Sequence, residues 1–302
     1  MDTTLSFGSC NFGKVKLGHK RRTKRLVKVV DCMCRHPGGT LPDKLSQPAN
    51  LRAFYRLMNR PEATHQVLIQ GHADHTRERL AALNGGVVLV LHDATELDYT
   101  SKTTLLDDLG QIGRGTRRGY ICHNSLAVRA DTGETLGLTS QILHHRADRP
   151  EKETVKQTRE RESRESRLWV QGAMASGAAP PNVQCVDVSD SLSDTFEYLA
   201  YEIGQQRSFV VRARENRTLE TPLEGQHYLF DGCRRLPAQT QRTLKVLPSP
   251  GRTGRTTTVQ ISFAPVTLAL PVKKLGEYPR QPLDVWVVRI WEPNTPPGEE
   301  PL

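Results

Sequence analysis

Two aspartates stand where a carboxylate could take part in chemistry. Asp93 comes after the apolar run of residues 87–91, and Asp190 follows a second predicted strand at residues 183–188. In a mixed sheet the ends of neighbouring strands can lie side by side, and Mg²⁺ takes carboxylate oxygens while it keeps several waters. Two such ions can activate a water and stabilise the leaving oxygen at a phosphodiester. The two positions therefore indicate half of a magnesium site for phosphodiester chemistry.

The same residues also have a purely structural interpretation. An aspartate after a strand is more often a turn former or a helix cap, and Asp98, Asp187 and Asp194 compete locally with the two candidates. Other chemistry has less support, because no glycine-rich phosphate loop opens a helix after a strand and no G-x-S-x-G elbow occurs. Neighbouring strand residues face opposite sides of a sheet, so His144 and His145 indicate a strand end rather than a metal pair.

Positive charge is concentrated at the start of the chain. Residues 1–60 hold thirteen Lys and Arg against three Asp, which is +10, whereas all 302 residues together carry +9. The remainder is therefore about neutral as a whole, and the basic segment is typical of a nucleic-acid-binding domain. A basic helix would place cations on a phosphate backbone; a solvated helix face is the alternative. The candidate DNA-binding cations are Lys16, Lys20, Arg21, Arg22, Lys24 and Arg25.

The elements that carry these cations are predicted to be helical. The basic helix should end at Pro37-Gly38-Gly39, since proline and glycine interrupt helices. A second helix is predicted over residues 43–59 and a third over residues 64–83.

The elements that carry the aspartates are predicted to form a mixed sheet. Strands are expected at residues 87–91, 119–129 and 135–144, then a helix at 151–176 whose first part is a solvated face of mixed charge. The strand at 183–188, a helix at 192–204 and a strand at 208–213 follow, with a loop at 173–181 before them. The order β-β-β-α-β-α-β suits a mixed sheet with helices on its faces.

The last third of the chain is predicted to be strand-rich. Strands are expected at residues 242–247, 256–263, 267–272 and 285–290, no helix pattern appears, and residues 292–302 form a proline-rich connector.

Composition sets outer limits on the class of protein. A chain of 302 residues suits about two domains, and 36% hydrophobic residues allow an ordinary core. The longest apolar run, residues 87–91, is far shorter than the ~20 residues of a membrane span. No apolar stretch follows the first basic residues, so no secretory signal is expected. Six scattered cysteines without a C-x-x-C pair favour a reducing cytoplasm over a zinc site or a disulfide framework.

Several motifs together resemble the bacterial DDE transposases of the cut-and-paste, hairpin-forming group (Tn-five and IS-four-like). Residues 12–13, 17–26, 41–42 and 54–59 are similar to the family's end-recognition domain. The family's first-aspartate motif, D-[ST]-T-x-L-x-Y, is similar to residues 93–99, with Ala94 as the departure. The second-aspartate motif is similar to residues 190–198, where Ser191 and Leu192 replace the usual Arg and Glu.

This resemblance implies the fold, the site and the partners. The fold would be α/β: an RNase H-like mixed sheet with a β-rich insertion, preceded by a small helical DNA-binding domain. The implied domains are residues 1–62 for end binding, 63–217 for the first part of the core, and 218–302 for the insertion and connector. Asp93 and Asp190 would be catalytic and would bind Mg²⁺ or Mn²⁺. The family strand at residues 209–214 implies that Arg212 and Arg214 contact DNA.

The implied partners are double-stranded transposon ends and target DNA, in a bacterial cytoplasm next to the nucleoid, with no membrane. The full-length family forms a homodimer through a C-terminal helical region that has no counterpart in these residues. The family's base-stabilising Trp and its Y-x2-R-x3-E-x6-K motif, which supplies the third acidic ligand, are also absent from them. We therefore expect a C-terminally truncated, nearly inactive transposase in which Trp286, Trp291, Glu299 and Glu300 do not replace the missing residues.

Two other functions stay open at this point. The chain could be a DNA-end-binding remnant without catalysis, or an inhibitor that occludes an intact transposase. It could also be a non-functional relic that folds poorly, because the loss of a central strand exposes sheet edge and apolar surface.

Overall fold

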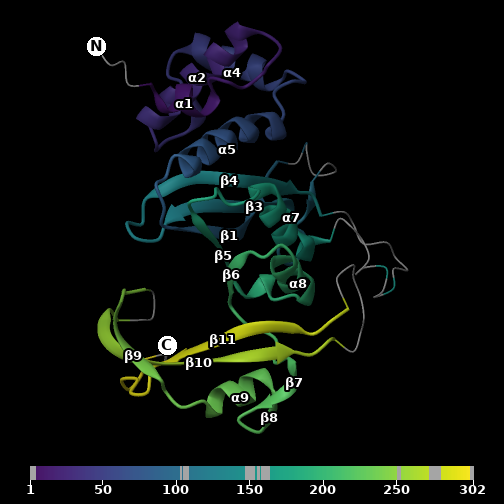
Figure 1. The fold of residues 1–302 in the computed structure, drawn as a ribbon. Helices are drawn as coiled ribbons and strands as arrows, with labels where there is room; N and C mark the ends of the chain where they lie inside the picture. The colour runs from purple at the N-terminus through teal and green to yellow at the C-terminus, as the bar shows by residue number, and fades with distance from the viewer. Residues whose placement is uncertain are drawn as a thin grey trace. The chain divides into compact units, whose positions relative to one another are not determined.

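The computed structural model describes residues 5–102, 104, 109–146, 154, 157, 164–249, 253–271 and 280–299. The contacts divide the chain into two compact units (Figure 1). Unit 1 comprises Met1–Ser193 and Gln205–Arg212, and unit 2 comprises Asp194–Gly204 and Ala213–Leu302.

Unit 1 begins with helices, as predicted. They are α1 (Phe7–Phe12), α2 (Lys20–Arg35), α3 (Leu41–Lys44), α4 (Pro48–Met58) and α5 (His65–Ala81). The basic helix α2 starts at Lys20, where the His19 ring Nδ1 accepts a hydrogen bond from the Arg21 backbone N–H at 3.0 Å. A small apolar core of Val15, Leu17, Leu26 and Leu57 holds this helical segment together.

The single helix predicted over residues 43–59 is wrong in one respect, because the structure divides it into α3 and α4. Pro48 is the first residue of α4. Proline has no amide hydrogen and its ring clashes with the preceding turn, so it begins a helix but does not continue one. The third helix agrees with the prediction: Thr64 Oγ1 caps α5 by accepting from the Val67 N–H at 3.3 Å.

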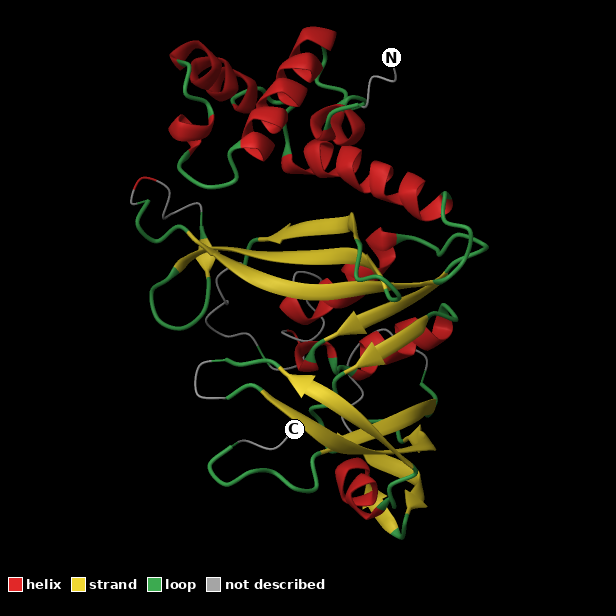
Figure 2. Ribbon diagram, turned by 90° about the vertical axis from the view of Figure 1, so that its left-hand side faces the viewer, coloured by secondary structure: helices red, strands yellow, loops and turns green. Residues whose placement is uncertain are grey.

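The mixed sheet predicted from the element order is confirmed (Figure 2). Its strands run in the spatial order β2-β3-β1-β5-β6, with β4 also paired to β3. The β2–β3, β1–β3 and β3–β4 pairs are antiparallel, whereas β1–β5 and β5–β6 are parallel. The strands are β1 (Val87–Asp98), β2 (Gly110–Gln111), β3 (Arg118–Arg129), β4 (Thr135–His144), β5 (Gln184–Ser189) and β6 (Ser208–Val211).

Helices pack on the sheet where the chain allows close approach. Helix α5 packs against β4, and α7 (Leu168–Ser176) packs against β3 and β4. A Cβ on Gly172 of α7 would lie 2.3 Å from the His123 ring, so only glycine permits this approach. The predicted loop at 173–181 begins later, because α7 continues to Ser176. Of the mixed-charge stretch 151–167, the structure describes residues 154, 157 and 164–167, and Glu165–Arg167 form one 3₁₀ turn directly before α7.

Strand β1 differs from its prediction in a way that matters for the site. It continues seven residues past Leu91 because β3 pairs with it as far as Asp98, which lies opposite Gly119. Asp93 is therefore inside a strand, opposite Asn124, and does not follow a strand end as predicted. Asp190 does come directly after β5. The two-residue strand β2 was not predicted.

Unit 2 is strand-rich, as predicted, with a sheet of order β11-β10-β7-β8 and β9 paired to β10. The predicted strands at 256–263 and 267–272 form one strand to Leu268 that passes through Pro265, and residue 272 lies outside the described residues. Pro265 lies opposite Trp286 of β11, and β9 pairs with β10 only between Arg255 and Ile261, so the proline removes no ladder bond to β9. The helices and strands of unit 2 are α8 (Phe196–Gly204), β7 (Thr218–Leu223), β8 (Gln226–Tyr228), α9 (Leu229–Arg235), β9 (Thr240–Val246), β10 (Arg255–Leu268) and β11 (Leu283–Trp291).

The prediction of no helix in the last third is wrong, because α9 lies there. This helix has only seven residues, and a helix of two turns gives little periodic signal. Its burial against β7 explains it: a Cβ on Gly232 would lie 2.8 Å from the Leu223 Cβ.

Candidate DNA interface and carboxylate site

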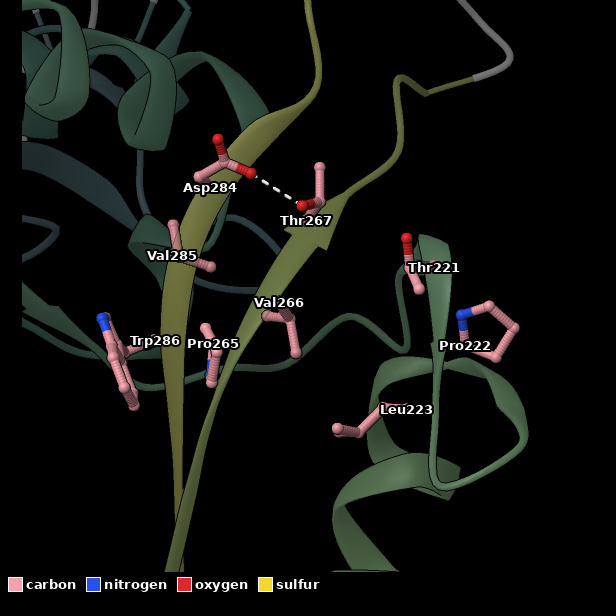
Figure 3. A pocket seen from close by; sticks show the side chains of 9 residues that line it. All are labelled: Thr221, Pro222, Leu223, Pro265, Val266, Thr267, Asp284, Val285 and Trp286. Atoms are coloured by element: carbon pink, nitrogen blue, oxygen red, sulfur yellow. Dashed lines mark hydrogen bonds between the residues drawn. The ribbon is translucent and has the colours of Figure 1, made fainter.

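A hollow of about 380 Å³ in unit 2 is the first site to place, because it contains one of the tryptophans discussed above. Its walls come from β7, β10 and β11, and within the β10–β11 wall Thr267 Oγ1 donates to Asp284 Oδ1 at 2.7 Å (Figure 3). Trp286 is 67% exposed at its rim. The lining is mostly apolar and open, and it brings together no set of catalytic groups.

The basic segment of unit 1 forms a different kind of hollow. It has a volume of about 610 Å³ and lies between residues 13–19 and the first turns of α2. Four exposed lysines line it: Lys14, Lys16, Lys20 and Lys24. Lys14 pairs with Glu78 at 2.5 Å, whereas the other three make no ion pair with any described residue. The sequence prediction of Lys16, Lys20 and Lys24 thus corresponds to one shared surface.

The start of α2 adds to the positive potential of this lysine hollow. The first N–H groups of a helix have no intrahelical acceptor, and the helix dipole places about half a positive charge there. Lys20 is the first residue of α2 and lines the hollow. Helix N-termini and lysines both favour phosphate oxygens, so the hollow is suited to a phosphate backbone.

Two of the six predicted cations have another task. Arg22 Nη1 donates to Glu62 Oε1 at 2.6 Å and to the Leu17 carbonyl oxygen at 3.0 Å, so it ties α2 to the segment before α5. A backbone hydrogen bond and then Arg22 lower the pKa of Glu62. Arg25 Nη1 donates to Asn50 Oδ1 of α4 at 3.1 Å. Arg21 is exposed and has no partner among the described residues.

The sheet brings Asp93, Asp190 and Arg212 into one row. His92 of β1, Ser189 of β5 and Val211 of β6 are the last residues that lie directly opposite one another in the parallel pairs. Each of the three residues of the row follows one of them by one position. Directly neighbouring residues of paired strands share a face of the sheet. Asp93 and Asp190 are therefore neighbours, although they are 97 positions apart in sequence (190 minus 93). Arg212 lies next to Asp190 on the following strand.

The two carboxylates of this row are available at the surface. Asp93 is exposed and has no hydrogen-bond partner among the described residues. Asp190 is also exposed, and its Oδ1 accepts from the Leu192 N–H at 3.0 Å. The turn-forming interpretation of Asp190 is thus realised through one oxygen, and the other oxygen makes no bond to a described residue. The exposed Arg212 is tied to the row by its backbone N–H, which donates to the Ser189 carbonyl oxygen at 3.2 Å.

Asp187, by contrast, belongs to a buried polar network on the opposite face. Its Oδ1 lies 2.6 Å from His92 Nε2, and its Oδ2 accepts from Arg207 Nε at 2.8 Å. The network continues from His92 Nδ1 to Ser125 Oγ at 3.0 Å, and Ser140 Oγ donates to Ser125 Oγ at 2.8 Å. The network connects β4, β3, β1 and β5 on the face of the sheet behind the carboxylate row. Both carboxylate oxygens of Asp187 are bonded in it, so neither is free to bind a cation.

The other two competing aspartates are also engaged. In unit 2, burial would raise the pKa of Asp194, but the Glu215 N–H, Arg217 and the Arg214 N–H lower it overall. Hydrogen bonds from Thr100, and then from Arg117, lower the pKa of Asp98 to about 2. Asp93 and Asp190 are the members of the sequence-derived set that keep unbonded carboxylate oxygens.

Arg214, the last predicted DNA contact, lies in unit 2. Its Nε donates to Glu215 Oε1 at 3.1 Å, and its backbone N–H donates to Asp194 Oδ2 at 2.7 Å. It is exposed but ion-paired, unlike Arg212 in unit 1.

A second cationic stretch was missed in the sequence. Residues 232–276 contain eight Lys and Arg and no Asp or Glu, and they include strands β9 and β10. A local charge count would have found it, but the average over the remainder of the chain concealed it. In the structure Arg255 forms ion pairs with two carboxylates: its Nη2 lies 2.7 Å from Glu292 Oε2, and its Nη1 lies 2.9 Å from Glu299 Oε2. Arg242 and Lys245 on β9 are exposed and have no partner among the described residues.

The residues set aside in the sequence have structural contacts. Glu299 accepts from Arg255 Nη1 and from the Thr253 N–H, and the Trp291 ring lies 4.1 Å from the Arg289 guanidinium carbon. Glu300 lies outside the described residues.

The donor set at Asp93 and Asp190 is compatible with a hard divalent cation. Both offer carboxylate oxygen, the ligand that Mg²⁺ and Mn²⁺ prefer, at a surface where waters complete the coordination. Among the described residues, no group of three or more His, Cys, Asp or Glu is placed to hold a metal ion. No helix in that part of the chain is long and apolar enough to cross a membrane. All six cysteines are free thiols.

Residues 6–63 match the family described as transposase DNA-binding. This range contains α1 to α4 and the lysine hollow, so the helical segment of unit 1 is similar to the DNA-binding domains of transposases. A solved structure, a piggyBac transposase synaptic complex with hairpin DNA, is similar over 83% of this chain at 8% identity and a TM-score of 0.33. A score this low does not establish a shared fold. The chain spans about half of that protein, 49% of its length.

Proposed function

We propose that this chain is the end-binding and carboxylate-bearing part of a DDE transposase similar to the bacterial Tn-five and IS-four-like group. The match of residues 6–63 to transposase DNA-binding domains carries the proposal. The catalytic part would be an RNase H-like sheet, which the order β-β-β-α-β-α-β and the central pairing of β1 with β3 and β5 support. The proposed domains are residues 1–62, 63–217 and 218–302.

End recognition would begin at the lysine hollow. Lys16, Lys20 and Lys24 would neutralise phosphates of one strand at the start of α2, where the positive end of the helix dipole also favours a phosphate. Phosphate contacts position a protein on DNA but do not read its sequence. Arg21, exposed on the first turn of α2, is the cation best placed beside the hollow to extend the contact.

Cleavage chemistry would belong to the row of Asp93, Asp190 and Arg212. Asp93 and Asp190 would hold Mg²⁺ or Mn²⁺, which when bound activates a water and stabilises the leaving oxygen of a phosphodiester. The side chain of Arg212 would pair with a DNA phosphate beside the two carboxylates and reduce the repulsion between them and the DNA. The buried network of Asp187 and His92 would keep the two carboxylates in register.

The exposed cations Arg242 and Lys245 of β9 would give unit 2 a second DNA contact. A two-stranded β-ribbon fits the major groove, and β9 and β10 form such a ribbon. We further propose, by resemblance alone, that the chain acts on transposon ends next to the bacterial nucleoid in the cytoplasm.

A second candidate function is a DNA-end-binding protein without catalysis that occludes the ends from an intact transposase. One observation favours it: the match to transposase DNA-binding domains and the lysine hollow both lie within residues 6–63, a range that contains neither Asp93 nor Asp190. Such a protein would keep its full affinity for end DNA when both Asp93 and Asp190 are replaced.

One experiment separates the two functions. Duplexes that bind the chain are selected from a randomised pool, and the affinity for the winning duplex is measured by fluorescence anisotropy against a scrambled duplex. Binding of Mn²⁺ is then measured for the chain and for Asp93→Ala, because a transposase without its third acidic ligand is expected to be nearly inactive in cleavage. Equal affinity for both duplexes would refute end recognition. Mn²⁺ binding that Asp93→Ala abolishes supports the transposase, whereas tight duplex binding with no Mn²⁺ binding supports the occluding protein.

A further inference from the structure

The carboxylate row continues on the other side of Asp93. Asn124 of β3 lies directly opposite Asp93 in the β1–β3 pair, and Gln141 of β4 lies directly opposite Asn124 in the β3–β4 pair. Directly opposed residues of antiparallel strands share a face, with Cβ atoms about 4.5–5.5 Å apart. Gln141, Asn124 and Asp93 therefore form a polar row on the face opposite the buried network of Asp187.

The amide of Asn124 is held in one orientation. Gln141 Nε2 donates to Asn124 Oδ1 at 2.7 Å, and Gln141 Oε1 in turn lies 3.0 Å from the His65 ring Nε2. The Asn124 oxygen also accepts a weak hydrogen bond from the Cys122 thiol at 3.7 Å, so the oxygen is occupied and the NH₂ group is the part of the amide that can donate. One of the two N–H groups makes a long contact of 3.4 Å with the Cys122 carbonyl oxygen, and the second has no other acceptor among the described residues.

The geometry points to Asn124 as a positioning residue for Asp93. The Asn124 NH₂ group would donate to one oxygen of the Asp93 carboxylate and leave the other oxygen facing Asp190 and the cation. Gln141 would act through Asn124 by fixing the amide. This inference rests on the proposed function, because it assumes that Asp93 binds a divalent cation.

The same hydrogen bonds reach the helical part of unit 1. His65 is the first residue of α5, which begins two residues after the DNA-binding match ends at residue 63. The bonds from His65 to Gln141 and from Gln141 to Asn124 therefore connect the exit of the DNA-binding domain to the residue opposite Asp93.

The test uses Mn²⁺ affinity of the full chain, measured from the electron paramagnetic resonance signal of the free ion, with the metal-free unfolding temperature as a second readout. The variants are Asn124→Leu, Gln141→Leu, the double variant and Asp93→Ala. Asn216→Leu is the matched control, because it removes asparagine hydrogen bonds in unit 2, one from the Phe230 N–H and a long one to Asp231 Oδ2. Loss of a partner that orients a metal ligand typically weakens metal binding about 10- to 100-fold.

We expect Asn124→Leu to weaken Mn²⁺ binding at least about tenfold while its metal-free unfolding temperature stays close to that of Asn216→Leu. Gln141→Leu should weaken binding less, and the double variant should be no weaker than Asn124→Leu alone, since both residues act through one amide. Gln141→Leu keeps the test decisive if Asn124→Leu folds poorly.

Three results would overturn the inference. If Asp93→Ala abolishes Mn²⁺ binding but Asn124→Leu and Gln141→Leu leave it unchanged, the positioning role fails and the proposed metal site stands. If the two single effects add in the double variant, Gln141 does not act through Asn124. If the wild-type chain binds no Mn²⁺, or Asp93→Ala binds it equally well, the metal site fails and the positioning role fails with it.

Discussion

The lysine hollow and the carboxylate row differ in how each is assembled. The hollow takes its lysines from residues 14–24, one short stretch of chain at the start of α2. The row takes Asp93, Asp190 and Arg212 from three strands, and only the parallel pairing of β1, β5 and β6 makes them neighbours. A charged surface of the first kind depends on a small helical core, whereas one of the second kind depends on the register of a whole sheet.

The two regions also differ in what neutralises their charges. In the helical segment, Arg22 and Arg25 bond to exposed or half-buried partners, and the hollow lysines face solvent. In the sheet, Asp187 is buried with Arg207 and His92 on the face opposite the exposed Asp93. The sheet site therefore depends on a buried ionic network, and the helical site does not.

The largest loss of stability is expected when the buried network of Asp187 is disrupted. Replacing Arg207 with Ala leaves the Asp187 carboxylate buried without its cation, which should lower the free energy of unfolding by about 3–5 kcal/mol. Urea unfolding measures it. Arg212→Ala, at the exposed opposite end of β6, is the matched control and should change stability by less than about 0.5 kcal/mol. Equal effects of the two variants would mean that the buried network does not hold the sheet.

A pH titration sharpens the same comparison. Burial, and then the nearby His92, lower the pKa of His123 from 6.5 to about 4. The unfolded chain therefore binds the proton more readily, so stability should be complete above pH 6.5 and should fall toward pH 4, by roughly 3 kcal/mol from this group. The difference between the wild type and His123→Leu, measured by urea unfolding at several pH values, isolates it. A pH-independent difference would contradict the assignment of a neutral buried ring.

In the helical segment the expected loss is in DNA affinity. The triple variant Lys16→Ala, Lys20→Ala, Lys24→Ala should weaken binding to a selected duplex about 100-fold at low salt and reduce the salt slope by about 3, one unit for each lost phosphate contact. The variant Arg52→Ala, Arg56→Ala, Arg60→Ala removes the same charge elsewhere in the segment. If both triple variants lose affinity equally, the hollow is not a special contact and overall charge decides.

The smallest expected effects distinguish two neighbouring arginines. Arg22→Ala should lower the free energy of unfolding by about 1 kcal/mol, because it removes partly exposed hydrogen bonds to Glu62 and Leu17. Arg21→Ala should leave stability within about 0.5 kcal/mol and weaken DNA binding severalfold. Thermal unfolding and anisotropy on the same two variants measure both properties, and the reverse pattern would contradict the separate tasks.

Local signals predicted much of this molecule. Lys16, Lys20 and Lys24 were identified because a charge cluster needs no distant partner, and Thr64 and the apolar run after Gly86 marked the beginnings of α5 and β1. The alternation of strands and helices was enough to predict a mixed sheet. The cationic stretch at 232–276 was also present in the sequence, but an average over the whole remainder of the chain hid it.

What only the tertiary structure decided is which groups are free and which are used. Nothing in the sequence distinguishes Arg22 from Arg21, or Asp187 from Asp190, because burial and hydrogen bonding depend on what packs against each side chain. The length of β1 past Leu91 depends on the partner strand β3, and so does the pairing of Asp93 with Asn124. Residue types and local order are properties of the chain alone, whereas register and desolvation arise only when distant segments pair.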